Sequence, residues 1–446
     1  MTSYGRRICN SASEAWGGAL GGSLFFDRGY LGASLSSYGT RYGTVAEDEV
    51  RIGMQSSRLA LEGEVRDLSG ALQSVKAQFR RSDYQHTEFN AGAAGTLFKN
   101  TGNDLRLQAR HARLGALDGV VGLQYEDGEF SADGSEAFAP YSRTRQGAAF
   151  AHEELATSWG RLSAGARLES VQVDSLGHPT LTRFTPASRS FQPISYALGA
   201  LWKVAPEWQL TSNLSWSERA PKDYELFADG EHVATNAYEV GNANLEKERS
   251  TNLDVGAAWR RGAHSAGVQA FVNQFGNYIS LEGTDLTASP PKYSYTQVQA
   301  RFTGLEVNGN IRLLEGAHKL DLALRADTVR ADNTSTGQPL PRIAPMRLGA
   351  TLLWSGGPWG ARLGVDQIAA QDRVPDGQLA TSGYTLWNAA LTYRVKTGKS
   401  QLLWYARLDN IGDTLAYSAS SILTQTAAGK APLPGRNLKA GLQISF

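Results

Sequence analysis

Apolar and polar residues alternate with a period of two along many segments of this 446-residue chain. Between Trp208 and Trp216, every second residue belongs to a mostly apolar face, and the residues between them are all polar. The same alternation recurs at 320–327, 387–394 and 438–446. Side chains spaced by two lie on one face of a β-strand. The chain is therefore predicted to be all-β and built from amphipathic strands.

The length of these segments favours strands that cross a membrane. Strands of soluble proteins average about 5–6 residues, whereas these segments run to about ten or more and carry Trp or Tyr near their ends, as lipid-facing strands do. The opposite face carries charged residues in nearly every segment, which suits a water-filled interior. No stretch approaches the ~18 apolar residues of a membrane helix. These features predict a transmembrane antiparallel β-barrel.

Short and long connections alternate along the chain, as in outer-membrane barrels. Tight turns are expected, for example, at 27–28, 67–70 and 397–399, and long segments at 84–94 and 218–247. This division gives about nineteen strands. With the last strand ending on the short-turn side, an odd number places the start of the first strand on the long-loop side. Bacterial barrels have an even number of strands, so an odd number of strands is expected to be missing at the N-terminus.

Composition and motifs exclude several classes of function. The 44 Lys and Arg balance 43 Asp and Glu, so the charge gives no reason to expect nucleic acid as a partner. No nucleophile motif, pair of catalytic carboxylates or phosphate-binding glycine loop is present, so we expect no enzyme. The alternatives are a passive porin-like or adhesive barrel, an outer-membrane lipase or protease, and a soluble β-propeller.

One motif is much longer than the others and starts at Glu218. Its residues are Glu218-Arg219-Ala220-Pro221, Tyr224-Glu225-Leu226-Phe227, Gly230, His232-Val233-Ala234-Thr235, Tyr238-Glu239, Gly241-Asn242, Leu245, Glu248, Ser250 and Asn252. Further matching stretches are Thr40-Arg41-Tyr42-Gly43, Tyr84–Phe89, Ala300-Arg301-Phe302, Asp409-Asn410-Ile411-Gly412-Asp413 and Pro434-Gly435-Arg436-Asn437. The chain closely resembles TonB-dependent outer-membrane receptors, and most of all the subgroup associated with zinc uptake.

The resemblance implies a barrel of 22 strands in the bacterial outer membrane, filled by an N-terminal plug that contacts the TonB complex. Residues 1–15 resemble the loop before the fourth strand, so the expected domains are a loop remnant at 1–15 and a single transmembrane barrel at 16–446, N-terminally truncated, with the plug absent. The resemblance further implies the lipid bilayer and the outer-membrane assembly machinery as partners. That machinery would read the last strand, which ends at Phe446.

The implied function is TonB-dependent transport of a scarce solute, a metal ion or metal chelate such as zinc. No resident cofactor is expected. The candidate metal ligands are His86, Glu88, Glu231 and His232, because they fall in the long outward segments and combine imidazole with carboxylate, which suits zinc. Solvated loop positions are the alternative interpretation. Zinc-type relatives carry a His before Pro434, where 418–430 has none, so copper, haem and other chelates stay open as solutes.

Overall fold

The computed structural model describes residues 8–134 and 136–446, and these form 22 strands assigned to one sheet. Nineteen of the strands are nine residues or longer, and β9, β12 and β13 have four to six residues. The predicted all-β class is confirmed. The expected number of about nineteen strands matches the long strands, and the three short ones lie within long connections. None of the described helices is long and apolar enough to cross a membrane.

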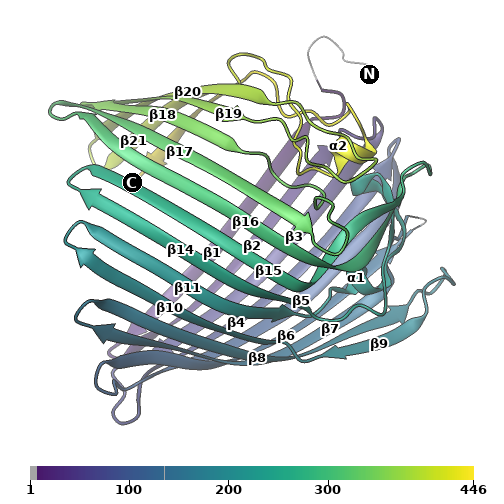
Figure 1. Cartoon of the computed structure of the whole chain (residues 1–446), viewed down its shortest axis with the longest axis horizontal. Coiled ribbons are helices and arrows are strands. Elements are labelled where there is room, and N and C mark those ends of the chain that lie inside the picture. Colours follow the sequence, from purple (N-terminus) through teal and green to yellow (C-terminus); the bar gives the residue numbers. More distant parts are fainter. Residues whose placement is uncertain (1–7, 135) are drawn as a thin grey trace. The chain divides into compact units, whose positions relative to one another are not determined.

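The chain divides into two compact units, which are described separately. The first unit contains residues up to Ala200, 213–252 and 274–300. Strands β1 to β9 pair in chain order, each antiparallel to the next (Figure 1). The elements that lie wholly in this unit are β1 (Ser13–Phe26), β2 (Gly29–Gly43), β3 (Val50–Val65), β4 (Leu72–Asn90), β5 (Ala93–His111), β6 (Leu117–Asp133), β7 (Tyr141–Thr157), β8 (Gly160–Gly177), β9 (Pro186–Phe191), α1 (Asp223–Phe227), β12 (Asp229–His232), the 3-10 helix η1 (Val233–Thr235) and β13 (Ala237–Val240).

The second unit contains residues 201–212, 253–273 and 301–446. Its strands β17 to β22 also pair antiparallel in chain order. Its elements are β17 (His318–Asn333), β18 (Arg347–Gly356), β19 (Trp359–Ile368), β20 (Tyr384–Thr397), β21 (Ser400–Asp409), α2 (Leu423–Thr426) and β22 (Asn437–Ser445). Five strands run from one unit into the other: β10 (Ile194–Ala205), β11 (Trp208–Arg219), β14 (Glu248–Arg261), β15 (His264–Asp285) and β16 (Lys292–Leu314).

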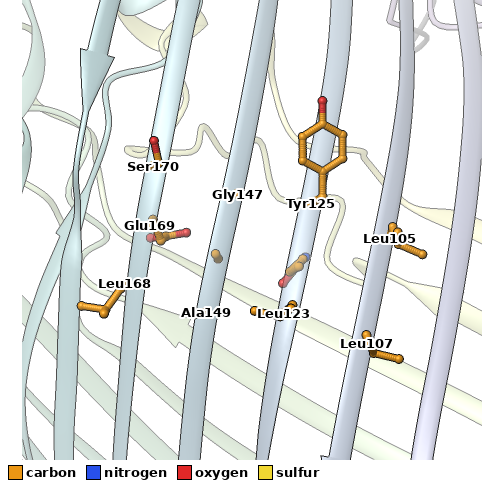
Figure 2. A pocket seen from close by; sticks show the side chains of 11 residues that line it. Leu105, Leu107, Leu123, Tyr125, Gly147, Ala149, Leu168, Glu169 and Ser170 are labelled. Carbon is orange, nitrogen blue, oxygen red and sulfur yellow. The ribbon is translucent and has the colours of Figure 1, made fainter.

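The sheet of the first unit has one apolar and one polar face, as the alternation predicts. On the apolar face, exposed leucines of β5, β6 and β8 surround Gly147 and Ala149 of β7, which leaves a shallow hollow of about 660 Å³ (Figure 2). On the polar face, Gln124 of β6 donates to Asp104 of β5, and Arg167 of β8 pairs with Glu169 at 2.9 Å. Exposed apolar side chains therefore cover one side, and hydrogen-bonded and paired polar side chains cover the other.

The tight turns lie where the sequence predicts them. Residues 27–28 connect β1 to β2, and the turn after Thr397 connects β20 to β21. Gly398 has φ 61°, a left-handed conformation that glycine adopts without steric cost. One predicted loop is instead strand: β4 continues to Asn90 and β5 begins at Ala93, so 84–94 is a hairpin with a two-residue turn.

Candidate functional site

The long connection between β11 and β14 has a defined fold, and ion pairs of Arg219 fix its first residues. The Arg219 guanidinium pairs with both oxygens of Glu225 in α1, at 2.8 and 3.0 Å, and with Glu248 of β14 at 2.9 Å. Glu225 also accepts the backbone N–H of Lys222 at 2.7 Å, which caps the first turn of α1. Leu226 then enters a buried cluster with Val171, Val173, Phe191, Leu245 and Ile279. Much of the recognised motif therefore has a structural role.

Strands β12 and β13 form a hairpin within this connection. Gly230 is paired with Glu239, and His232 with Ala237. A Cβ at Gly230 would lie 2.8 Å from the Cα of Phe138, so the hairpin approaches the 137–138 backbone more closely than any other residue type would allow. The backbone N–H of Asp229 donates to the carbonyl of Phe138 at 2.8 Å, which fixes the hairpin there.

His232 is held on one face of this hairpin. Its ring stacks on Phe138 with centroids 4.1 Å apart and an interplanar angle of 3°. Its Nδ1 lies 2.9 Å from Oε1 of Glu239. Glu231 is the next residue along the strand and so lies on the opposite face, where Tyr238 bonds Asp229 at 2.9 Å. The structure thus separates Glu231 from His232.

His86 lies near the C-terminal end of the 19-residue strand β4. Counted from Leu72, it is beyond the 9–11 residues with which a strand crosses a bilayer. Its ring stacks on Phe98 of β5 with centroids 4.5 Å apart, and its Nδ1 lies 2.9 Å from the Tyr84 hydroxyl. Burial, followed by the charge of His232, lowers the pKa of His86 to about 4. His86 is therefore neutral at physiological pH and able to offer a nitrogen lone pair.

Glu88, two residues farther along the same face of β4, is a buried carboxylate. The residue is 4% exposed, and Oε2 of its carboxylate has no hydrogen-bond partner. Burial, followed by the negative charge of Glu136, raises the pKa of Glu88 to about 7, and the charge of His232 acts in the opposite direction. A buried carboxylate oxygen without a donor is costly for folding, so it is suited to receive an external cation.

Three of the four predicted ligand residues are thus gathered in one place. The charge of His232 acts on the pKa of both His86 and Glu88, and the charge of Glu136 acts on the pKa of Glu88. The sequence interpretation missed Glu136 and Glu239. Glu239 follows the recognised Tyr238 and is a carboxylate seven residues from His232, which was the available signal. Among the described residues, no group of three or more His, Cys, Asp or Glu side chains already stands at metal-binding spacing.

Comparison with known structures shows the same fold in several transporters. The copper transporter OprC superposes with a TM-score of 0.82 at 18% identity, covering 97% of this chain and 72% of OprC. The unliganded ferric citrate transporter FecA gives 0.75 at 16% identity, covering 98% and 71%. The FrpB iron transporter from Neisseria meningitidis (F5-1 variant) gives 0.72 at 13% identity, covering 96% and 72%.

Residues 2–411 match the family described as TonB dependent receptor-like, beta-barrel. This match covers most of the chain and agrees with the long strands, their two contrasting faces and the superpositions. Members of this family are transporters and receptors of the outer membrane rather than enzymes. The chain belongs to the family of TonB-dependent receptor β-barrels.

Proposed function

We propose that this protein takes up a metal ion or a metal chelate across the outer membrane with energy supplied through TonB, and that zinc is the first candidate cargo. The observation that carries the proposal is the buried Glu88, whose Oε2 has no hydrogen-bond partner and which shares a face of β4 with His86, while the charge of His232 acts on both residues. The names of OprC, FecA and FrpB record copper, ferric citrate and iron as cargo. A metal cargo therefore agrees with the proteins of similar fold.

Zinc suits the chemistry of these three side chains. Zinc binds imidazole nitrogen and carboxylate oxygen, and sites with only three protein ligands keep the fourth position for water or another ligand. Two imidazoles and one carboxylate would supply an incomplete set of ligands. Because the side chains do not stand at metal-binding spacing, the cargo would draw the side chains of β4 towards His232 on arrival. Such a site binds a passing ion without the permanence of a structural zinc site.

Copper is the second candidate, and Met54 is the reason. In the pairing of β3 with β4, Met54 lies directly opposite His86 on the same face of the sheet. Thioether sulfur is a soft ligand that selects Cu(I). A cargo bound through Met54 and His86 would be copper, whereas a cargo bound through Glu88 and His232 would be zinc.

Calorimetric titration of the purified protein with zinc tests the proposal. Replacing His86, Glu88 and His232 together with Ala removes all three ligands, so we expect the zinc affinity to fall by at least about tenfold, since even outer-shell changes have effects of this size. Glu231→Ala is the matched control, because Glu231 neighbours His232 but lies on the other face. It should leave the affinity unchanged.

Two other outcomes would contradict the zinc site or the choice of zinc as cargo. Unchanged affinity in the triple variant would remove these residues from the zinc site. Cu(I) binding that is lost in Met54→Leu, together with zinc binding that never exceeds the background, would favour copper as the cargo. The heat-dependent shift in electrophoretic mobility typical of folded barrels should be checked for each variant before titration.

A further inference from the structure

We infer that Glu239 is a positioning residue that fixes His232 as the tautomer with its proton on Nδ1, so that Nε2 is the nitrogen presented to the cargo. The part of this inference that concerns the cargo rests on the function proposed above. The part that concerns the tautomer stands on the contacts around Glu239 alone.

Glu239 is buried and surrounded by polar partners. It is 2% exposed, and its Oε1 lies 2.9 Å from His232 Nδ1 and 2.8 Å from the Thr235 hydroxyl. The Tyr295 hydroxyl donates to its Oε2 at 3.2 Å. Both carboxylate oxygens are therefore engaged, and the side chain reaches no solvent that could compete for them.

The partners of Glu239 decide the direction of its hydrogen bond with His232. The Thr235 and Tyr295 hydroxyls donate to the two carboxylate oxygens, so both oxygens act as acceptors. A carboxylate that acts in this way can only accept hydrogen bonds. The contact at 2.9 Å is therefore a donation from His232 Nδ1–H, and in the neutral form of the ring the lone pair lies on Nε2.

Phe138 fixes the orientation of the His232 ring. Its ring lies parallel to the imidazole at 4.1 Å, and the backbone of the hairpin is bonded to the Phe138 carbonyl. A flip of the imidazole about the Cβ–Cγ bond would put Cδ2 in the place of Nδ1 and would break the bond to Glu239. The ring plane and the position of Nε2 are thus fixed before any cargo arrives.

This arrangement serves metal capture in a known physical way. A carboxylate that accepts the second N–H of a histidine fixes the ring orientation and makes the other nitrogen a stronger ligand, and its loss lowers metal affinity by about 10–100-fold. His232 also influences the pKa of His86 and Glu88. Glu239 would therefore set the geometry of the site without touching the cargo.

The first test leaves Glu239 unchanged. NMR of protein with ¹⁵N-labelled histidine in lipid nanodiscs reports which nitrogen of each ring is protonated, and His232→Ala identifies the signals of His232. We expect the Nδ1–H tautomer for His232 in the parent protein. The Nε2–H tautomer in the parent would overturn the inference.

The second test uses Glu239→Gln, which keeps the size of the side chain but can donate as well as accept. We expect mixed tautomers of His232 and a zinc affinity about 10–100-fold lower, with Glu231→Gln as the matched control that changes neither. Unchanged tautomers and affinity in Glu239→Gln would overturn the inference. If the parent shows the Nδ1–H tautomer but binds no zinc, the proposed function fails while the tautomer assignment stands.

Discussion

At the scale of single residues, Glu88 is the most informative side chain of the site. It carries a carboxylate in a place that is 4% exposed, and one of its oxygens has no donor. Folding gains nothing from such a group, because a buried polar atom without a partner costs free energy. Groups with strongly shifted pKa values cluster at functional sites. The position of Glu88, on the same face of β4 as His86 and within reach of the charge of His232, therefore points to a role in binding.

The raised pKa of Glu88 predicts that zinc affinity depends on pH. Below about pH 7 the carboxyl is protonated, so its proton must leave before the oxygen can bind zinc. We expect the affinity of the parent protein to fall as the pH drops from 8 to 6. Glu88→Gln should bind zinc more weakly and lose that part of the pH dependence. Calorimetric titrations at several pH values measure both effects.

The same residue should leave a signature in stability. Its pKa in the folded state lies above the usual value of 4.5, so the folded state binds more protons than the unfolded state between about pH 4.5 and 7, and stability falls as the pH rises through that window. Glu88→Gln should remove this loss and leave the stability below pH 4.5 unchanged.

An identical dependence of zinc affinity on pH in parent and variant would contradict the role of Glu88.

The sequence identified His86, Glu88 and His232 as candidate ligands, but it could not show that His232 and Glu231 lie on opposite faces of their strand. Glu231 and His232 looked equivalent, because a four-residue strand is too short for its alternation to be read without the hairpin register. Glu136 was missed because long-range packing brings it to the site, and no spacing along the chain records that packing. Glu239 was missed although it lies only seven residues from His232, because the hairpin register that joins them cannot be read from two four-residue strands. Arg219 was recognised through the motif, yet its role in holding α1 emerged only from its two carboxylate partners.

At the scale of elements, alternation was a reliable guide where strands are long and apolar on one side. Leu320, Leu322 and Leu324 of β17 share a face, and Leu322 is opposite Leu352 of β18. On the other face, Asp321 pairs with Arg312, and Arg325 with Asp366. Alternation did not identify the strand at Tyr84–Asn90, because a strand that continues beyond the membrane no longer needs apolar residues on its outer side.

A matched pair of substitutions tests the two faces of β17. Leu322→Arg places a charge on the lipid side and should lower the free energy of unfolding by about 2–4 kcal/mol if the residue is near the bilayer midplane. Ala323→Arg places the same charge among the paired Asp and Arg residues and should cost less. Reversible folding into lipid vesicles measures both values, and equal losses would contradict the assignment of faces.

At the scale of the whole molecule, the fold and the membrane were predictable, whereas the cargo was not. The repeated long strands and the motif after Glu218 both led to the family that the match over residues 2–411 shows. The three similar structures bear names of copper, ferric citrate and iron transporters. One fold thus serves several metals, so the choice between them depends on a few side chains.

Metal uptake in cells tests the proposed transport activity directly. Cells that express the gene from its native locus should accumulate radioactive zinc at low external concentration, and deletion of TonB should abolish that accumulation, because transport in this family is energised through TonB. Glu239→Gln should reduce uptake at limiting zinc more than at saturating zinc, since it weakens capture. A passive pore predicts a different result: accumulation that rises linearly with external zinc and persists without TonB. Parallel measurements with copper and ferric citrate identify the cargo, and saturable, TonB-dependent uptake of either of them without zinc would overturn the choice of zinc.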